Sequence, residues 1–199
     1  MSVLKLERRE LIRETRMEIL NGKIYLMAGT SANHNYVFGN ILNIFMNFLK
    51  GKKCQVFGEN MKVIFDEDNK VLPDLKIVCD PSKIKKNAIE GAPDLIVEIL
   101  SPRTQTRDMT EKKDLYEKHG VKEYWIVDTN WKTIKVYILK DGKYILDNNY
   151  TIFDEDDIAE IKRIGDEEEI KRMETTSFKT SVFGDNLIIE IADVFDNIE

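Results

Sequence analysis

Pro93-Asp-Leu-Ile-Val-Glu-Ile-Leu100 is an apolar run of strand length that ends at the helix-breaking pair Ser101-Pro102. The pattern predicts a buried central strand. Successive side chains of a strand point to opposite faces, so Glu98 shares its face with Ile96 and Leu100. A carboxylate in such surroundings is costly unless it is paired, hydrogen-bonded or bound to a metal. Glu98 is therefore the first candidate for a functional residue.

The composition limits the class of protein. With 199 residues, 42% hydrophobic and 33% charged, the sequence predicts one soluble α/β domain over residues 1–199. No apolar run approaches the ~20 residues that span a bilayer, and the N-terminus lacks the apolar core of a signal peptide. We therefore expect a cytoplasmic protein without a membrane partner. Cys54 and Cys79 lie in apolar, strand-like runs, which favours reduced thiols packed in the core.

The net charge of −6 is concentrated in one segment. Residues 154–174 carry ten acids and four bases, whereas the remaining residues carry 26 of each. The segment mixes Glu and Lys at helical spacings with little apolar content, so we predict an exposed helical or flexible insert. The balanced charge of the main body neither excludes nor indicates a polyanionic partner.

The rest of the chain alternates strand and helix signals. Asn21-Gly22 between two strand-like runs predicts an N-terminal β-hairpin. Ser31 or Asn33 can cap a helix that ends near Leu49, and a turn over residues 66–70 joins two strands into a second hairpin. The remaining predictions are helices over residues 3–15 and 107–119, strands over 53–65, 72–79, 121–128 and 133–139, and a C-terminal strand with an apolar anchor over 186–195.

A second carboxylate follows a proline at Pro73-Asp74, where a strand begins. If this strand pairs with the Glu98 strand, the two acids meet and repel each other unless a cation bridges them. Hard oxygen ligands with open water positions suit Mg²⁺ or Mn²⁺, which can activate water to attack a phosphodiester. Asp94 is too close to Glu98 for a separate strand. A zinc site formed by His34, His119 and the cysteines matches no familiar ligand spacing.

Lys112 falls on the apolar arc of the helix that follows Pro102. At 100° per residue, Met109, Leu115 and Tyr116 define an inward face that includes Lys112, while Lys113 falls at its border. The Lys112 ammonium could lean toward the acid pair and serve the transition state or orient water. Equally, its stem could lie along the apolar surface while the charge forms a salt bridge.

Several short motifs together resemble the Uma-type family of restriction endonucleases, within the PD-(D/E)XK nuclease superfamily. The pieces are residues 21–29 followed by His34, Pro73-Asp74, residues 93–102, Arg107-Asp108 with Lys112 and Tyr116, residues 120–128, and a C-terminal Ile-Ile-Glu-Ile-Ala-Asp-Val-Phe195. Their order and spacing cover nearly the whole chain.

The resemblance implies a restriction-endonuclease-like α/β fold, with a mixed central sheet flanked by helices, and magnesium-dependent cleavage of DNA. It implies that Asp74 and Glu98 are metal ligands, with the main-chain carbonyl of Ile99 as a third. Glu59 and His34 are lesser candidates for the site. The lysine that the superfamily places two residues after the second acid is absent, because Leu100 stands there.

We therefore expect a cytoplasmic, Mg²⁺-dependent endodeoxyribonuclease, with Mn²⁺ as a possible substitute. Asp74 and Glu98 would bind the metal, and Lys112 would neutralise developing charge. One alternative is a non-catalytic binding or assembly module that keeps the fold, and another is a nuclease that acts on RNA. DNA is the expected partner, and a homodimer is plausible because cutting two strands needs two sites.

Overall fold

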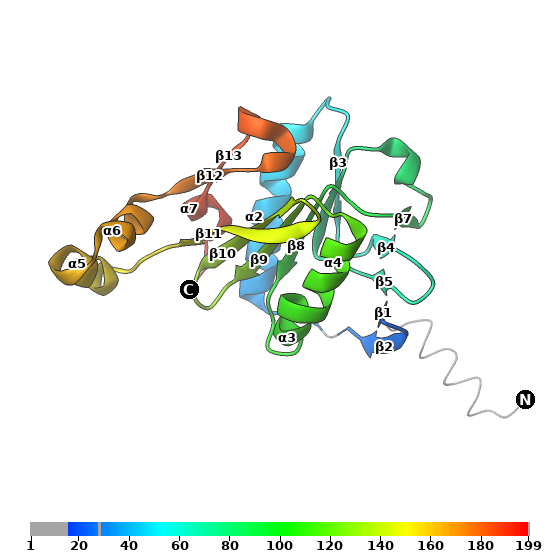
Figure 1. Ribbon diagram of the computed structural model, residues 1–199, viewed down its shortest axis with the longest axis horizontal. Helices are drawn as coiled ribbons and strands as arrows, with labels where there is room; N and C mark the ends of the chain where they lie inside the picture. The colour runs from blue at the N-terminus through cyan, green and yellow to red at the C-terminus, as the bar shows by residue number, and fades with distance from the viewer. Residues whose placement is uncertain (1–15, 28, 199) are drawn as a thin grey trace, which may run out of the picture.

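A six-stranded mixed sheet forms the centre of the computed structural model, which describes residues 16–27 and 29–198. Its strand order is β11-β10-β9-β8-β6-β3, and all of these strands except β6 are labelled in Figure 1. The predicted central strand is β8 (Leu95–Ile99), antiparallel to β6 (Leu75–Val78) and parallel to β9 (Glu123–Asp128). The outer strands are β3 (Gln55–Gly58), β10 (Thr133–Lys140) and β11 (Lys143–Thr151).

Helices cover both faces of this sheet, as the resemblance to the nuclease family implied. Leu95, Val97 and Ile99 pack with the buried face of α2 (Ala32–Leu49), a helix that Ser31 caps. Ile96 packs on the opposite face, against the helical segment that follows β8. That segment runs continuously through α3 (Gln105–Arg107), a π-helical turn η2 (Asp108–Lys112) and α4 (Lys113–His119).

The π turn changes one detail of the predicted helix. Lys112, Leu115 and Tyr116 are buried as predicted, but Met109 is 41% exposed, so its placement on the inward face was wrong. A π turn contains more residues per turn than an α-helix, so a constant 100° step misplaces residues on its far side. The helical phase is correct for α4 and fails at Met109.

A second, five-stranded sheet has the order β2-β1-β5-β4-β7. The predicted N-terminal hairpin is β1 (Met17–Leu20) and β2 (Lys23–Leu26), and Asn21 and Gly22 both have positive φ, as a two-residue turn of this kind requires. The second predicted hairpin is divided between the two sheets. β3 pairs with β6 in the large sheet, while β4 (Lys62–Ile64) pairs with β5 (Lys70–Val71) in the small one. The fifth strand, β7 (Ala88–Glu90), follows the short helix η1 (Pro81–Lys83).

The acidic insert is helical and lies outside the core. Its two helices, α5 (Glu155–Ile164) and α6 (Glu167–Glu174), have no buried residue and project from the sheets (Figure 1). The chain then returns through β12 (Ser177–Lys179), η3 (Ser181–Asn186), β13 (Ile188–Glu190) and α7 (Ile191–Val194). Ile191, Val194 and Phe195 are buried, so the apolar C-terminal anchor is confirmed. The helix predicted over residues 3–15 lies outside the described residues.

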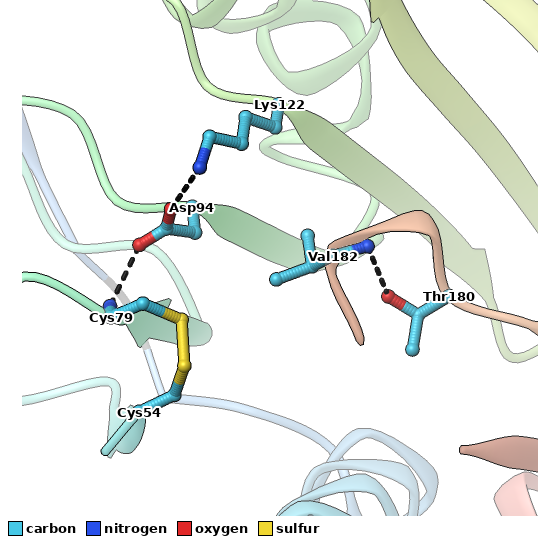
Figure 2. Close-up of a disulfide and its surroundings, with 6 residues drawn as sticks. All are labelled: Cys54, Cys79, Asp94, Lys122, Thr180 and Val182. Atoms are coloured by element: carbon cyan, nitrogen blue, oxygen red, sulfur yellow. Dashed lines mark hydrogen bonds and ion pairs between the residues drawn. A yellow bond between two sulfur atoms is a disulfide. The ribbon is translucent and has the colours of Figure 1, made fainter. Parts of the chain in front are cut away.

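Cys54 and Cys79 form a disulfide, so the prediction of reduced thiols was wrong (Figure 2). The register of β3 on β6 explains the pairing. Gln55 lies opposite Val78, and because the strands are antiparallel, Cys54 just before β3 lies opposite Cys79 just after β6. The prediction of reduced thiols depends on the apolar run around each cysteine, and such a run contains no information about the strand opposite. Beside this bond, the backbone N–H of Cys79 donates to Asp94 (2.7 Å), whose other oxygen binds Lys122 (2.7 Å).

Among the residues that the structure describes, none of the helices has the length and apolar character required to cross a membrane.

Candidate active site

The two predicted carboxylates lie side by side on one face of the central sheet. β6 pairs with β8 as predicted, and because Leu75 lies opposite Val97, Asp74 follows opposite Glu98. Both residues are buried, with relative exposures of 7% for Asp74 and 3% for Glu98. The pairing of two strands thus brings together two acids that are 24 positions apart in the chain.

Asp74 is held by the neighbouring strand and by α2. Its Oδ2 accepts a hydrogen bond from the backbone N–H of Ile99 (2.7 Å), and its Oδ1 lies 3.3 Å from Nε2 of His34. His34 belongs to the first turn of α2, where its N–H donates to the capping hydroxyl of Ser31 (3.2 Å). His34 is therefore part of this site, while the other histidine, His119, faces Asp66 at 3.4 Å.

Glu98 has one engaged oxygen and one free oxygen. Its Oε1 accepts from Lys112 Nζ (2.9 Å) and from the Tyr116 hydroxyl (2.6 Å). Its Oε2 has no hydrogen-bond partner within the described part of the chain, and Glu98 lines a cavity at the site. The buried acid therefore presents one oxygen to this cavity.

Lys112 is the centre of a buried charge cluster that includes Glu98. Besides Glu98, its Nζ lies 2.9 Å from Glu18 Oε1 and 3.4 Å from Asp108 Oδ1. Glu18 also accepts from the backbone N–H of Leu72 (2.8 Å), which fixes its position on β1. Lys112 therefore forms the salt bridge that one of the two interpretations predicted, and it does so with three carboxylates instead of one.

The cluster has three carboxylates and one ammonium group, and the pKa values of Glu98, Asp108 and Lys112 are shifted. Burial raises the pKa of Glu98 well above its usual value, against the opposing effect of Lys112, and burial likewise raises the pKa of Asp108. Burial also works to lower the pKa of Lys112, but the carboxylates of Glu98, Glu18 and Asp108 outweigh it and raise that pKa well above its usual value. Because Lys112 is shared among three carboxylates, it does not offset the effect of burial on the pKa values of Glu98 and Asp108.

A second buried lysine, Lys76, lies on the same face of β6 as Asp74. It is fully buried, and its Nζ donates to the carbonyl of Pro73 (2.9 Å). Burial lowers the pKa of Lys76 to about 7, while Glu98 and Asp74 act to raise it. Lys76 was not among the predicted site residues, although its position two residues after Asp74 places it on the same face as that acid.

The contacts of Glu18 and Asp108 with Lys112 were not predicted, although Asp108 belongs to one of the motifs that resemble the family. The sequence contained a signal for Glu18. It lies two residues before the apolar Leu20 on a predicted strand, so the two side chains share the inward face. Asp108 lies four residues before Lys112 on a helix, a spacing that places oppositely charged side chains together.

A cavity of about 400 Å³ opens onto the acids. Its wall includes Asp74, Glu98, Ile99 and Lys112, and its rim includes three arginines, namely Arg16, Arg103 and Arg107. Glu59 also lines the cavity, where its Oε2 is paired with Arg16 at 2.9 Å. All six predicted site residues therefore lie around one cavity, with Glu59 engaged by an arginine.

The donor set suits a hard divalent cation held by few protein ligands. Oε2 of Glu98 has no hydrogen-bond partner among the described residues, Oδ1 of Asp74 faces only Nε2 of His34, and Ile99 lines the same cavity. Within the described residues, no group of three or more His, Cys, Asp or Glu side chains could hold a metal. Mg²⁺ commonly binds through one or two carboxylates and keeps several waters, so these residues fit such an ion but not a closed zinc site.

The fold and the paired acids define a restriction-endonuclease-like α/β protein. A crystal structure from Anabaena variabilis, described as a putative nuclease belonging to DUF820, superimposes with a TM-score of 0.67 over 94% of this chain and 96% of that one, at 20% identity. Uncharacterized protein slr1290 of Synechocystis is 32% identical over 150 residues, 74% of this chain and 77% of that protein. A second Synechocystis protein, sll1609, is 27% identical over 127 residues, 62% of this chain and 71% of its own.

The sequence profile of the Uma2 family, described as "Putative restriction endonuclease", matches residues 4–164. The chain belongs to the Uma2 family.

Proposed function

We propose that the protein is a metal-dependent endodeoxyribonuclease that hydrolyses phosphodiester bonds at the Asp74–Glu98 cavity. The observation that carries this proposal is the pair of adjacent buried acids at one cavity that three arginines also line, with Oε2 of Glu98 free and Oδ1 of Asp74 in contact only with His34. Membership of a restriction endonuclease family supports it. The cytoplasmic location and the possible homodimer remain predictions.

Asp74 and Glu98 are the proposed metal ligands, with the Ile99 carbonyl as a third. Bound Mg²⁺, or Mn²⁺ in its place, would lower the pKa of a bound water and stabilise charge on the phosphate. The cations Arg16, Arg103 and Arg107 at the rim are suited to contact DNA phosphates. His34 lies against Asp74 and would fix the orientation of that carboxylate.

Lys112 has a different proposed role from the one that the sequence suggested. An ammonium has three N–H donors, and the Nζ of Lys112 already faces three carboxylates. We assign it the positioning of Glu98, and its neutralisation of charge on the phosphate stays a prediction. Because Leu100 replaces the superfamily's lysine, no other amine follows directly on this strand.

The test is the nicking of supercoiled plasmid by purified protein with Mg²⁺ or Mn²⁺. We expect Asp74→Asn and Glu98→Gln to reduce the rate at least about 100-fold, as loss of an essential charge-stabilising group commonly does. Glu90→Gln on β7, whose side chain is 59% exposed, is the matched control and should cleave normally. Absence of cleavage with either metal, together with unchanged Mn²⁺ binding in both variants, would refute the proposal. An RNA substrate run in parallel separates DNA cleavage from RNA cleavage.

A non-catalytic module with the same fold is the second candidate. The observation that favours it is the full engagement of Lys112, combined with Leu100 at the position of the missing amine. This candidate predicts that the protein binds DNA with an affinity that Arg103→Ala or Arg107→Ala reduces, without any cleavage. Metal-dependent nicking would exclude it.

A further inference from the structure

Trp131 is the most exposed large apolar side chain in the described part of the chain. Its relative exposure is 77%, whereas Trp125, the other tryptophan, is fully buried in the core. An exposed indole offers a large, flat apolar face on which a ligand can pack. No role for Trp131 follows from the acid pair or from the charge cluster.

Trp131 lies at the edge of the proposed active site. It belongs to the turn between β9 and β10, and the residues just before it, Thr129 and Asn130, line the cavity that contains Glu98. β8 and β9 are parallel, with Ile99 opposite Val127, so both strands end at the same edge of the sheet. The backbone N–H of Leu100 donates to the Val127 carbonyl (2.8 Å) and holds these two ends together.

The turn that carries Trp131 is braced. Oδ1 of Asp128 accepts from the backbone N–H of Asn130 (2.9 Å) and of Trp131 (3.3 Å). Lys132, which follows with φ of 45°, donates through Nζ to the carbonyl of Ile198 (3.2 Å). A ring held on a fixed turn loses little conformational freedom when a ligand packs against it.

We propose that Trp131 stacks on an unpaired base of a nucleic-acid strand whose phosphates lie along the arginine rim of the cavity. The inference rests on the proposed function and adds the contact that a base would make there. An aromatic face beside cations is the combination that binds single strands, because the cations contact the phosphates and every base offers a π face. The same combination favours a strand with separated bases over an intact stacked duplex.

The test uses two short oligonucleotides in the presence of Ca²⁺, so that binding is measured without relying on cleavage. One is single-stranded oligodeoxythymidylate, and the other has the same length and phosphates but abasic sites in place of the thymines. Because Trp125 is buried, quenching of tryptophan fluorescence reports mainly on Trp131. We expect the oligodeoxythymidylate to quench the fluorescence and the abasic strand to quench it little.

Trp131→Ala should weaken binding of the oligodeoxythymidylate about tenfold and leave binding of the abasic strand unchanged. Ile164→Ala, at an apolar residue of α5 that is 66% exposed, is the matched control and should change neither affinity. Equal affinity of wild type and Trp131→Ala for oligodeoxythymidylate would overturn the proposal, as would no binding of either strand. Base-dependent binding by a protein that neither cleaves DNA nor loses Mn²⁺ binding in Asp74→Asn and Glu98→Gln would support stacking and refute the nuclease. The failure of one proposal is therefore distinguishable from the failure of the other.

Discussion

Glu98 and Glu123 are two buried glutamates on neighbouring strands with opposite relations to their surroundings. Glu98 on β8 is 3% exposed and Glu123 on β9 is completely buried. Glu98 has one oxygen bound to Lys112 and Tyr116 and the other free toward a cavity. Both oxygens of Glu123 are engaged by neutral donors, with Trp125 Nε1 on Oε1 (2.6 Å) and groups of residues 180–182 on Oε2.

The comparison teaches that burial of an acid does not by itself indicate chemistry. Glu123 ties β9 to the returning C-terminal segment, and its satisfied oxygens leave nothing to bind a ligand. Glu98 differs because the protein leaves one acceptor open where a cation could be held. The free oxygen, more than the burial, separates a candidate site from a structural junction.

Removal of the Lys112 ammonium, which neutralises Glu98 while neutral donors bind Glu123, should cause the largest loss of stability among these variants. Lys112→Met leaves Glu18, Glu98 and Asp108 without their counterion, and we expect the free energy of unfolding to fall by about 3–5 kcal/mol. Urea denaturation at neutral pH measures this. Lys113→Met, at the half-buried neighbour on the same helix, is the control and should cost less than about 1 kcal/mol. Equal stability of the two variants would show that the cluster is not held by Lys112.

Glu123→Gln should destabilise the fold without affecting the site. An amide nitrogen would face donors that now bind a carboxylate, at a cost of about 2 kcal/mol. Hydrogen exchange at the N–H groups of Ser181 and Val182 should accelerate, because both donate to Glu123. Plasmid nicking per folded molecule should be unchanged. A loss of nicking as large as that of Glu98→Gln would end the distinction between the two acids.

Lys76 permits a test of the charge around Glu98 through pH. Its folded pKa of about 7 lies below the usual 10.5, so the unfolded chain binds more protons between these values. Wild-type stability should therefore rise with pH across that window, by at most ~1.4 kcal/mol per pH unit from this group. The stability of Lys76→Met relative to wild type should be highest below pH 7 and decline toward pH 10.5. Lys86→Met, at an exposed lysine, is the control for the loss of one ammonium group. A flat difference for Lys76→Met would contradict the lowered pKa of Lys76.

Tyr116→Phe should give the smallest of these effects. It removes one hydroxyl donor from Oε1 of Glu98 and leaves Lys112 in place, so we expect a loss of about 1 kcal/mol in unfolding free energy. Tyr137→Phe, in the same aromatic group, is the control because its hydroxyl has no hydrogen-bond partner among the described residues. Thermal unfolding of both variants measures the difference. A greater loss for Tyr137→Phe would show that the hydroxyl of Tyr116 does not help to hold Glu98.

The parts of the fold that sequence predicted are those that depend on local periodicity. The alternation along β8 placed Glu98 correctly, and the Asn21-Gly22 turn and the helix capped by Ser31 were found from short-range signals. The inward position of Lys112 followed from helical spacing within one segment. Each of these depends on a few neighbouring residues.

The parts that were wrong or overlooked depend on which strands pair. The Cys54–Cys79 disulfide and the division of one hairpin between two sheets both follow from strand register, which apolar runs do not encode. Glu18 reaches Lys112 only because β1 comes to lie beside this site. A local pattern could indicate that each of these residues was buried, but not which partner it would meet.

The two-residue repeat along β8 makes the site dependent on the length of the chain around it. Insertion of a single residue before Glu98 would exchange the two faces of the strand and turn its carboxylate toward α2, while an aliphatic side chain took its place beside Asp74. Two inserted residues would restore the side but shift the acid one pleat along. Insertions and deletions are therefore better tolerated in the exposed α5–α6 hairpin, where no buried side chain changes orientation.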